Sequence, residues 1–158
     1  MIHPTATIYP NVKIGKNVTI GANCIIGAPA ESKKFWGKES EYGVIICDNA
    51  IITGNVTIDA GTIKDTIIYE DTFIMKGCHI GHDATINKGA TLSPHVLIGG
   101  HSSIGAGTKM GMGSSVHHRV NVPNDCVIGM GGIVLKSSEL WQGGVYVGTP
   151  VAFLKWNK

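Results

Sequence analysis

The sequence has few charged and few aromatic residues: of its 158 residues, 15% are charged and 6% are aromatic. The formal net charge is +2 and no run of like charges exceeds Lys33-Lys34, so a groove for nucleic acid is not indicated. No stretch reaches the roughly 20 apolar residues of a membrane span, and residues 1–25 lack the pattern of a secretory signal. We therefore expect a cytoplasmic protein that is not transmembrane.

Disulfide and helical architectures are also disfavoured. The four cysteines, Cys24, Cys47, Cys78 and Cys126, have no C-x-x-C spacing, and we expect them to be free thiols. Isoleucine and valine (21 and 13) far outnumber leucine (5), and glycine is abundant (22). This balance favours pleated surfaces over helices and argues against disorder, coiled coils and helix bundles.

A period of six residues runs along the chain. Aliphatic residues occupy every sixth position from Ile2 to Ile26, from Ile46 to Ile58, and twelve times without a slip from Ile68 to Val134. A small residue usually precedes the aliphatic one by two positions in the last series. Neither a helix nor a simple amphipathic strand has this period. Each unit predicts one short strand and one corner, and such units must stack to bury their apolar sides.

This pattern resembles the hexapeptide repeat of the left-handed parallel β-helix, in which three units make one triangular coil. The resemblance implies an all-β fold and its handedness. Twenty aliphatic positions give between six and seven coils. The interruptions predict an external loop at about 28–43 and a small bulge around Lys64-Asp65. We assign residues 1–136 to the β-helix and residues 137–158 to a C-terminal strand and cap.

Stacking places residues 18 apart in adjacent layers, roughly 4.8 Å from each other. Gly100 then lies over His82, and His118 lies one layer higher. Five histidines fall at one corner over three layers: His79, His82, His101, His117 and His118. His3 and His95 fall elsewhere and are expected to be solvated surface residues. Neighbouring imidazoles disfavour protonation of one another, so the group can accept a proton at neutral pH.

Such a group can bind a metal or transfer a proton. The gamma-class carbonic anhydrases, which share this fold, bind zinc with paired histidines five residues apart on one coil. No two histidines here have that spacing, so a zinc lyase is the weaker alternative and we predict no metal ligands. A non-catalytic trimeric scaffold is a third possibility.

The segment from Phe73 to His118 resembles the active-site coils of the UDP-N-acetylglucosamine O-acyltransferases of lipid A biosynthesis. Three family motifs match in one ungapped register: HIxHD at residues 79–83, Gly-His at 100–101, and His-Gln at 117–118, where this chain has His118. The segment GAPAESKKFWGKES resembles the family's acceptor loop, with Lys34 retained and Ser32 replacing an acidic residue. We expect no counterpart of the family's helical C-terminal domain, and GGVYVGTPVAF is more similar to acetyltransferases of this superfamily.

The resemblance, combined with the needs of acyl transfer, implies the residue roles. His82 is the general base, and Asp83 or a backbone carbonyl fixes its tautomer. Gly100 supplies an oxyanion donor, since its lack of a side chain permits close approach. The substrate-binding residues are expected to be His79, His101, His117, His118, Lys34, Ser32 and Met130. Met130 matches the position that limits acyl-chain length in the family.

The resemblance further implies a homotrimer with each site between two prisms. The donor is expected to be acyl-CoA or acyl carrier protein, and the acceptor a small molecule such as a nucleotide sugar. No permanently bound cofactor is expected. The identity of the acceptor, oxygen against nitrogen acylation, and the type of donor stay open at this point.

Overall fold

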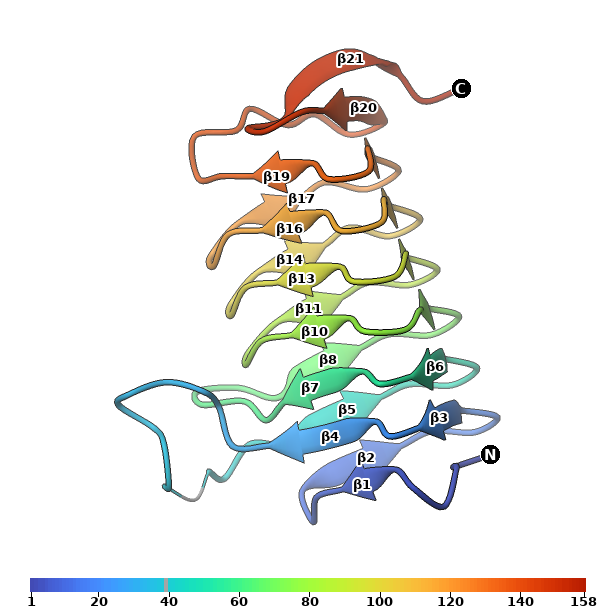
Figure 1. Cartoon of the computed structure of the whole chain (residues 1–158), viewed down its shortest axis with the longest axis vertical. Coiled ribbons are helices and arrows are strands. Elements are labelled where there is room, and N and C mark those ends of the chain that lie inside the picture. The colour runs from blue at the N-terminus through green and yellow to red at the C-terminus, as the bar shows by residue number, and fades with distance from the viewer. Residues whose placement is uncertain (39) are drawn as a thin grey trace.

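The computed structural model describes residues 1–38 and 40–158, and this part of the chain contains strands and turns without a helix. No helix that could cross a membrane is therefore found in it. The chain winds upward as a tall three-sided prism, with the two ends of the chain at opposite ends of the stack (Figure 1). The all-β fold expected from the six-residue period is confirmed.

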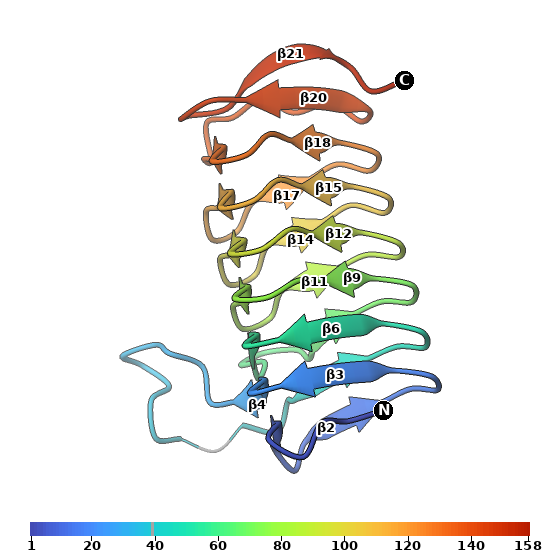
Figure 2. The same cartoon turned by 45° about the vertical axis from the view of Figure 1, so that its right-hand side comes forward.

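Three sheets form the sides of the prism (Figures 1 and 2). The seven-stranded sheet contains β1 Thr7–Ile8, β4 Ile25–Ala28, β7 Thr57–Asp59, β10 His79–Ile80, β13 Leu97–Ile98, β16 Ser115–Val116 and β19 Ile133–Val134. The six-stranded sheet contains β2 Val12–Ile14, β5 Val44–Ile46, β8 Thr66–Ile68, β11 Thr85–Ile86, β14 Ser103–Ile104 and β17 Asn121–Val122. The eight-stranded sheet contains β3 Thr19–Ala22, β6 Ile51–Gly54, β9 Phe73–Ile74, β12 Thr91–Leu92, β15 Lys109–Met110, β18 Val127–Ile128, β20 Gly144–Val147 and β21 Ala152–Trp156.

The strands pair in parallel at a spacing of 18 residues. His79 pairs with Leu97, and Leu97 with Ser115. The aliphatic residue of each repeat points inward, and those from Ile20 to Val134 are almost completely buried. The small residues two positions earlier share this core, Cys78 and Cys126 among them. Ile2 is 47% exposed because the coil that would cover it from below does not exist at this end of the described stack.

Tight corners between the sheets need a left-handed backbone conformation. At the corner that follows the seven-stranded sheet, Asp83, His101 and Arg119 have φ of 62°, 60° and 60°. Asparagine and aspartate tolerate this region better than most side chains, whereas histidine and arginine are less usual there. The repeat geometry thus fixes the backbone of this corner in three successive layers.

Two insertions interrupt the coils, and both leave the prism at that same corner. Residues 29–43 connect β4 to β5, and residues 60–65 connect β7 to β8. The longer insertion projects from the lower part of the prism (Figure 1). This confirms the external loop expected at about 28–43. The two insertions lie in adjacent layers, directly below the layers that carry the histidines.

The last two strands close the upper end. Strand β20 continues the parallel sheet over β18, and β21 turns back antiparallel to β20. Tyr146 is fully buried beneath this pair, and Phe153 makes edge contacts with Tyr146 and Trp156. A terminal strand and cap over the last coil were expected from the sequence. The boundary placed at residue 136 stays a prediction.

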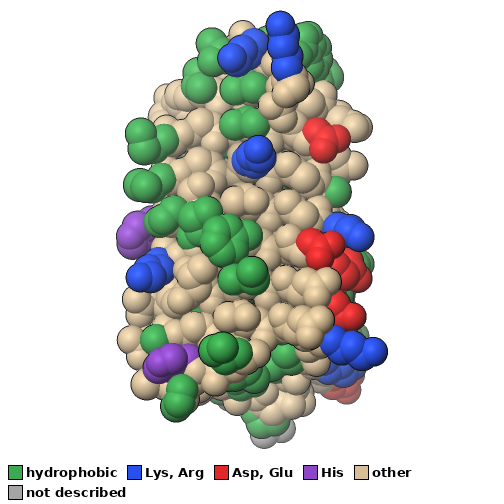
Figure 3. All heavy atoms as spheres, turned by 90° about the vertical axis from the view of Figure 1, so that its right-hand side faces the viewer, with side chains coloured by type: hydrophobic (Ala, Val, Ile, Leu, Met, Phe, Trp, Pro, Cys, Tyr) green, Lys and Arg blue, Asp and Glu red, His purple; other side chains and the backbone are tan. Residues whose placement is uncertain are grey.

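The outer surface reflects the low charge content. Figure 3 views the prism from the side of the eight-stranded sheet, where hydrophobic side chains gather near mid-height and acidic side chains lie along one edge. Ile51 on β6, 41% exposed, is one of the outward hydrophobic residues of this sheet.

Candidate active site

Five histidines lie at one edge of the prism, where the seven-stranded sheet turns into the six-stranded sheet. His79 is on β10, His82 follows β10, His101 follows β13, and His117 and His118 follow β16. The layers are bonded to each other through the backbone. The amide of His101 donates to the carbonyl of His82 over 2.9 Å, and the amide of Arg119 donates to the carbonyl of Gly100 over 2.9 Å.

Asp83 orients the ring of His82. Its Oδ2 lies 2.6 Å from His82 Nδ1, and its side chain is fully buried. The amides of Thr62, Ile63 and Lys64 donate to Oδ1 over 2.9–3.0 Å, and the Thr62 hydroxyl donates to Oδ2 over 2.7 Å. Burial alone would raise the pKa of Asp83, but hydrogen bonds from His82, Ile63 and Thr62 bring that pKa well below its usual range. The insertion 60–65 is thus a cradle for this carboxylate.

The bond to a carboxylate assigns the proton of the His82 ring to Nδ1, which leaves the lone pair of Nε2 free. Gly100 lies directly over this nitrogen. A Cβ added to Gly100 would be 2.9 Å from Nε2 and 3.0 Å from Cε1 of His82. Glycine is therefore required for His82 to keep its position and for Nε2 to be reached. The amide of Gly100 donates no hydrogen bond within the described part of the chain.

His101 packs edge-on against His82, with the ring centroids 5.0 Å apart. Burial lowers the pKa of His101; the Asp83 carboxylate opposes this change and the Arg119 guanidinium reinforces it. Ligand atoms of His82, Asp83 and His101 lie within 4.8 Å of one another, close enough to hold a metal. The two Asp83 oxygens, however, already accept five hydrogen bonds. The arrangement therefore fits a proton-transfer network better than a metal cage.

His79 has a second carboxylate beside it. Its Nδ1 lies 2.8 Å from Thr57 Oγ1, and its Nε2 lies 3.8 Å from Asp59 Oδ2. Asp59 is only 5% exposed. Burial raises the pKa of Asp59, whereas His79 opposes the increase. Asp59 was not identified from the sequence, because the insertion that follows β7 makes the spacing to His79 differ from 18.

The upper end of the edge is basic. The His117 and His118 rings lie 4.2 Å apart, and His118 Nε2 lies 3.3 Å from Lys136 Nζ. Partial desolvation lowers the pKa of His118, and the Lys136 ammonium adds to this effect. Lys136 was also not identified from the sequence, although it stands 18 residues after His118 and the register could have revealed it. Together with the neighbouring Arg119, these groups can bind an anion such as a phosphate.

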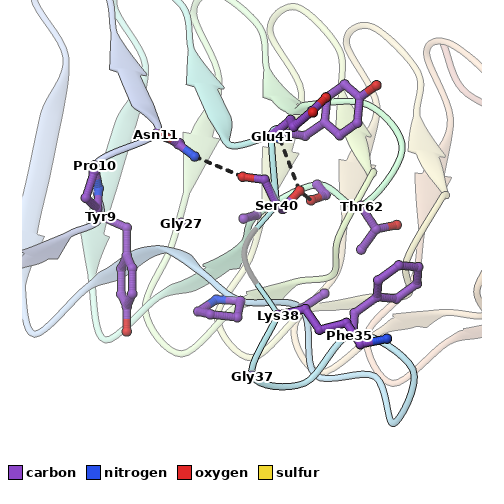
Figure 4. Close-up of a pocket in the computed structure, with 15 residues that line it drawn as sticks. Tyr9, Pro10, Asn11, Gly27, Phe35, Gly37, Lys38, Ser40, Glu41 and Thr62 are labelled. Carbon is purple, nitrogen blue, oxygen red and sulfur yellow. Dashed lines mark hydrogen bonds between the residues drawn. The ribbon is translucent and has the colours of Figure 1, made fainter.

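A hollow of about 800 Å³ lies below the histidines, between the external loop and the prism. Tyr9, Asn11 and Phe35 line it, as does Thr62, which also donates to Asp83 (Figure 4). Asn11 Nδ2 donates to the carbonyl of Ser40 over 3.1 Å and so ties the loop to the first coil. The hollow therefore opens next to the cradle of Asp83.

The structure does not bring every predicted residue to the histidines. Lys34 is exposed on the external loop, with Nζ 5.1 Å from the ring centroid of Phe35, and Ser32 forms a turn there. The loop reaches the site through Glu31, whose amide donates to the Asp59 carboxylate. Met130 follows β18 at a different corner, between the eight-stranded and seven-stranded sheets, and is 76% exposed. Its side chain points away from the core, as expected.

Comparison with known proteins agrees with this architecture. The family model described as bacterial transferase hexapeptide (six repeats) matches residues 1–30 and 65–100, and the one described as hexapeptide repeat of succinyl-transferase matches residues 35–60. No curated protein matches the sequence significantly.

Solved structures match over nearly the whole chain. LpxA, a UDP-N-acetylglucosamine acyltransferase from Bacteroides fragilis, is 26% identical, with a TM-score of 0.83 over 99% of this chain and 75% of that one. The UDP-N-acetylglucosamine acyltransferase of Arabidopsis is 20% identical, with a TM-score of 0.76 over 99% of this chain and 74% of that one. PerB from Caulobacter crescentus, solved with CoA and GDP-perosamine, is 21% identical, with a TM-score of 0.66 over 97% of this chain and 56% of that one.

Solenoids of opposite hand do not superpose, so a match of this quality also gives the chain the handedness of those structures. The left-handed β-helix expected from the repeat pattern is confirmed. The chain is a hexapeptide-repeat protein with the left-handed β-helix fold, and it resembles the UDP-N-acetylglucosamine acyltransferases over nearly its whole length.

Proposed function

We propose that this protein transfers an acyl group from a thioester to a sugar-nucleotide-like acceptor, with His82 as the general base. One observation carries the proposal. His82 Nδ1 is 2.6 Å from a buried carboxylate, and its Nε2 is free beneath a glycine. An imidazole held in this way is suited to take a proton from an attacking nucleophile.

The reaction proceeds by direct transfer. His82 Nε2 takes the proton of an acceptor hydroxyl or amine as its oxygen or nitrogen attacks the thioester carbonyl carbon. The negative charge develops on the carbonyl oxygen, where the free amide of Gly100 donates a hydrogen bond to it. The carbon–sulfur bond then breaks, and the imidazolium returns the proton to the leaving thiolate. Asp83 stabilises the imidazolium between these two steps.

The other residues of the edge bind the two substrates. His79 and His101 flank His82 and contact the acceptor, while His117 and His118 contact the donor near the basic end of the edge. Lys34 and Ser32, on the external loop, contribute to acceptor binding. The donor is acyl-CoA or acyl carrier protein, both of which contain phosphate for Lys136 and Arg119 to bind. PerB, solved with CoA and GDP-perosamine, supports this pair of substrates.

We also propose a homotrimer with the sites between prisms. Within one chain, Met130 stands at one corner of the triangular section and the histidines at another. Only a neighbouring copy can therefore bring a Met130 to the histidine edge and limit the length of the acyl chain there.

The test is a thiol-release assay with a panel of acyl-CoAs, acyl carrier proteins and nucleotide sugars. His82→Ala is expected to lower turnover by roughly 10²- to 10⁴-fold, because it removes the general base from the surface of an otherwise intact core. His95→Ala is the matched control, since His95 is exposed at another corner. Equal turnover in His82→Ala and the wild type would falsify the assignment.

A further inference from the structure

We infer that Asp59 binds the protonated amine of an amino-sugar acceptor, so that the protein acylates nitrogen rather than oxygen. This inference rests on the proposed acyl transfer, and it selects one of the two nucleophiles that His82 could activate. The carboxylate of Asp59 would pair with an ammonium group, which a hydroxyl acceptor does not have.

The surroundings of Asp59 differ from those of Asp83. Five hydrogen bonds occupy Asp83. In the described part of the chain, the amide of Glu31 is the one hydrogen-bond donor that reaches Asp59, and His79 Nε2 stays 3.8 Å away. The Asp59 side chain is nevertheless 93% buried, given its 7% exposure. A buried carboxylate with so few partners is costly unless a positively charged partner arrives.

The position of Asp59 faces the reacting groups. Thr57 pairs with His79, so the same register places Gly81 over Asp59. Gly99 stands over Gly81, and Gly100 lies over His82. Two glycines therefore leave the column above Asp59 free of side chains, beside His82 and Gly100. His82 also lowers the pKa of Asp59, although less than His79 does, which indicates that the two groups sense each other.

The proton balance of the reaction favours this use of Asp59. An ammonium must lose two protons to become an amide, whereas a hydroxyl loses one to become an ester. The Asp59 carboxylate accepts the first proton and later releases it to solvent. His82 Nε2 accepts the second as the carbon–nitrogen bond forms, and passes it to the thiolate when the carbon–sulfur bond breaks. The site therefore has one base for each proton.

The experiment compares UDP-N-acetylglucosamine with its analogues in which an amine replaces the hydroxyl at C3 or at C4. Binding is measured by calorimetry on His82→Ala, and turnover on the chain with His82 intact. In both, Asp59→Asn is expected to weaken the amine acceptor about 10- to 100-fold and to leave the hydroxyl acceptor nearly unchanged. Asparagine keeps an oxygen for the Glu31 amide, so the loop anchor is retained.

Asp65→Asn is the matched control, because Asp65 also anchors the external loop, by accepting the amide of Gly43 over 2.8 Å, and it is not at the histidine edge. It should leave the ratio of amine to hydroxyl binding unchanged. An equal loss for both acceptors in Asp59→Asn would reduce Asp59 to a loop anchor and overturn the inference. So would turnover of the hydroxyl acceptor alone, which leaves the proposed function intact. Selective amine binding without thiol release from any donor would support Asp59 and refute acyl transfer.

Discussion

Gly100 illustrates how much can depend on a missing side chain. Gly100→Ala would place a methyl group 2.9 Å from His82 Nε2, so either the ring or the Gly100 backbone must move. We expect turnover to fall at least 10²-fold with little loss of stability, because the change is at the surface and outside the apolar core. Turnover and the thermal midpoint should be measured together. An active Gly100→Ala variant would mean that the space above Nε2 is not used.

Asp83 and Asp59 predict opposite responses to pH. The pKa of Asp83 is lowered on folding, so its stabilisation is complete above the ordinary carboxyl range and is lost as pH falls through about 4 and below. The pKa of Asp59 is raised, so its ionisation on folding costs stability as pH rises above about 4. Asp83→Asn should therefore be destabilising at pH 7, and Asp59→Asn stabilising.

Urea unfolding at pH 3, 5 and 7 checks both signs. The midpoints of the two variants should approach that of the wild type at pH 3, where both carboxyl groups are protonated in the unfolded chain. A destabilised Asp59→Asn at pH 7 would mean that the bond to the Glu31 amide outweighs the burial of the charge.

These residues also mark the limit of prediction from the sequence. The column of His82, Gly100 and His118 follows from counting, because the chain from Ile68 onward has an unbroken register. Asp59 and the amides that hold Asp83 could not be found in this way. Both depend on how residues 60–65 leave the coil and return, and backbone donors carry no side-chain signal.

At the scale of elements, the repeat determines the strands, whereas the two insertions are specified by contacts that the repeat does not contain. Ser40 donates to the carbonyl of Gly61 over 2.7 Å, and Gly43 donates to Asp65, so the loop after β4 is fastened to the bulge after β7. The existence of both insertions could be predicted from a break in the period. The hollow between them could not, since it depends on these fastenings.

The external loop gives a prediction about acceptor binding. Lys34 stacks on Phe35, which lines the hollow, and we expect Lys34→Ala to raise the acceptor KM several-fold and to leave the donor KM unchanged. Lys33→Ala is the control, because it removes an equal charge from an adjacent exposed position. Steady-state kinetics with each substrate varied in turn decide the matter. A raised donor KM in Lys34→Ala would assign the loop to the other substrate.

At the scale of the whole molecule, Met130 links acyl length to assembly. Met130→Gly is expected to shift donor preference toward longer chains, from the acetyl to about ten-carbon range that we propose for the wild type. Each methylene that gains a buried place contributes about 0.8 kcal/mol. Met112→Gly is the control, because Met112 stands one layer below at the same corner.

The length profile should be measured with acyl donors of two to sixteen carbons, and the oligomeric state by light scattering. A monomeric protein would contradict the proposed site between prisms. An unchanged length profile in a trimeric Met130→Gly variant would reduce Met130 to packing between copies.

The stacking of the coils restricts how the length of this chain can change during evolution. Adding or losing a whole coil of 18 residues above Lys136, or below the external loop, would alter only the height of the prism. Between Thr57 and Lys136, the same change would separate the base from its oxyanion donor or from the cradle of Asp83. One extra residue in a strand there would turn every later side chain to the opposite side of the sheet. Insertions near the site are therefore confined to the corners, where both of those found here occur.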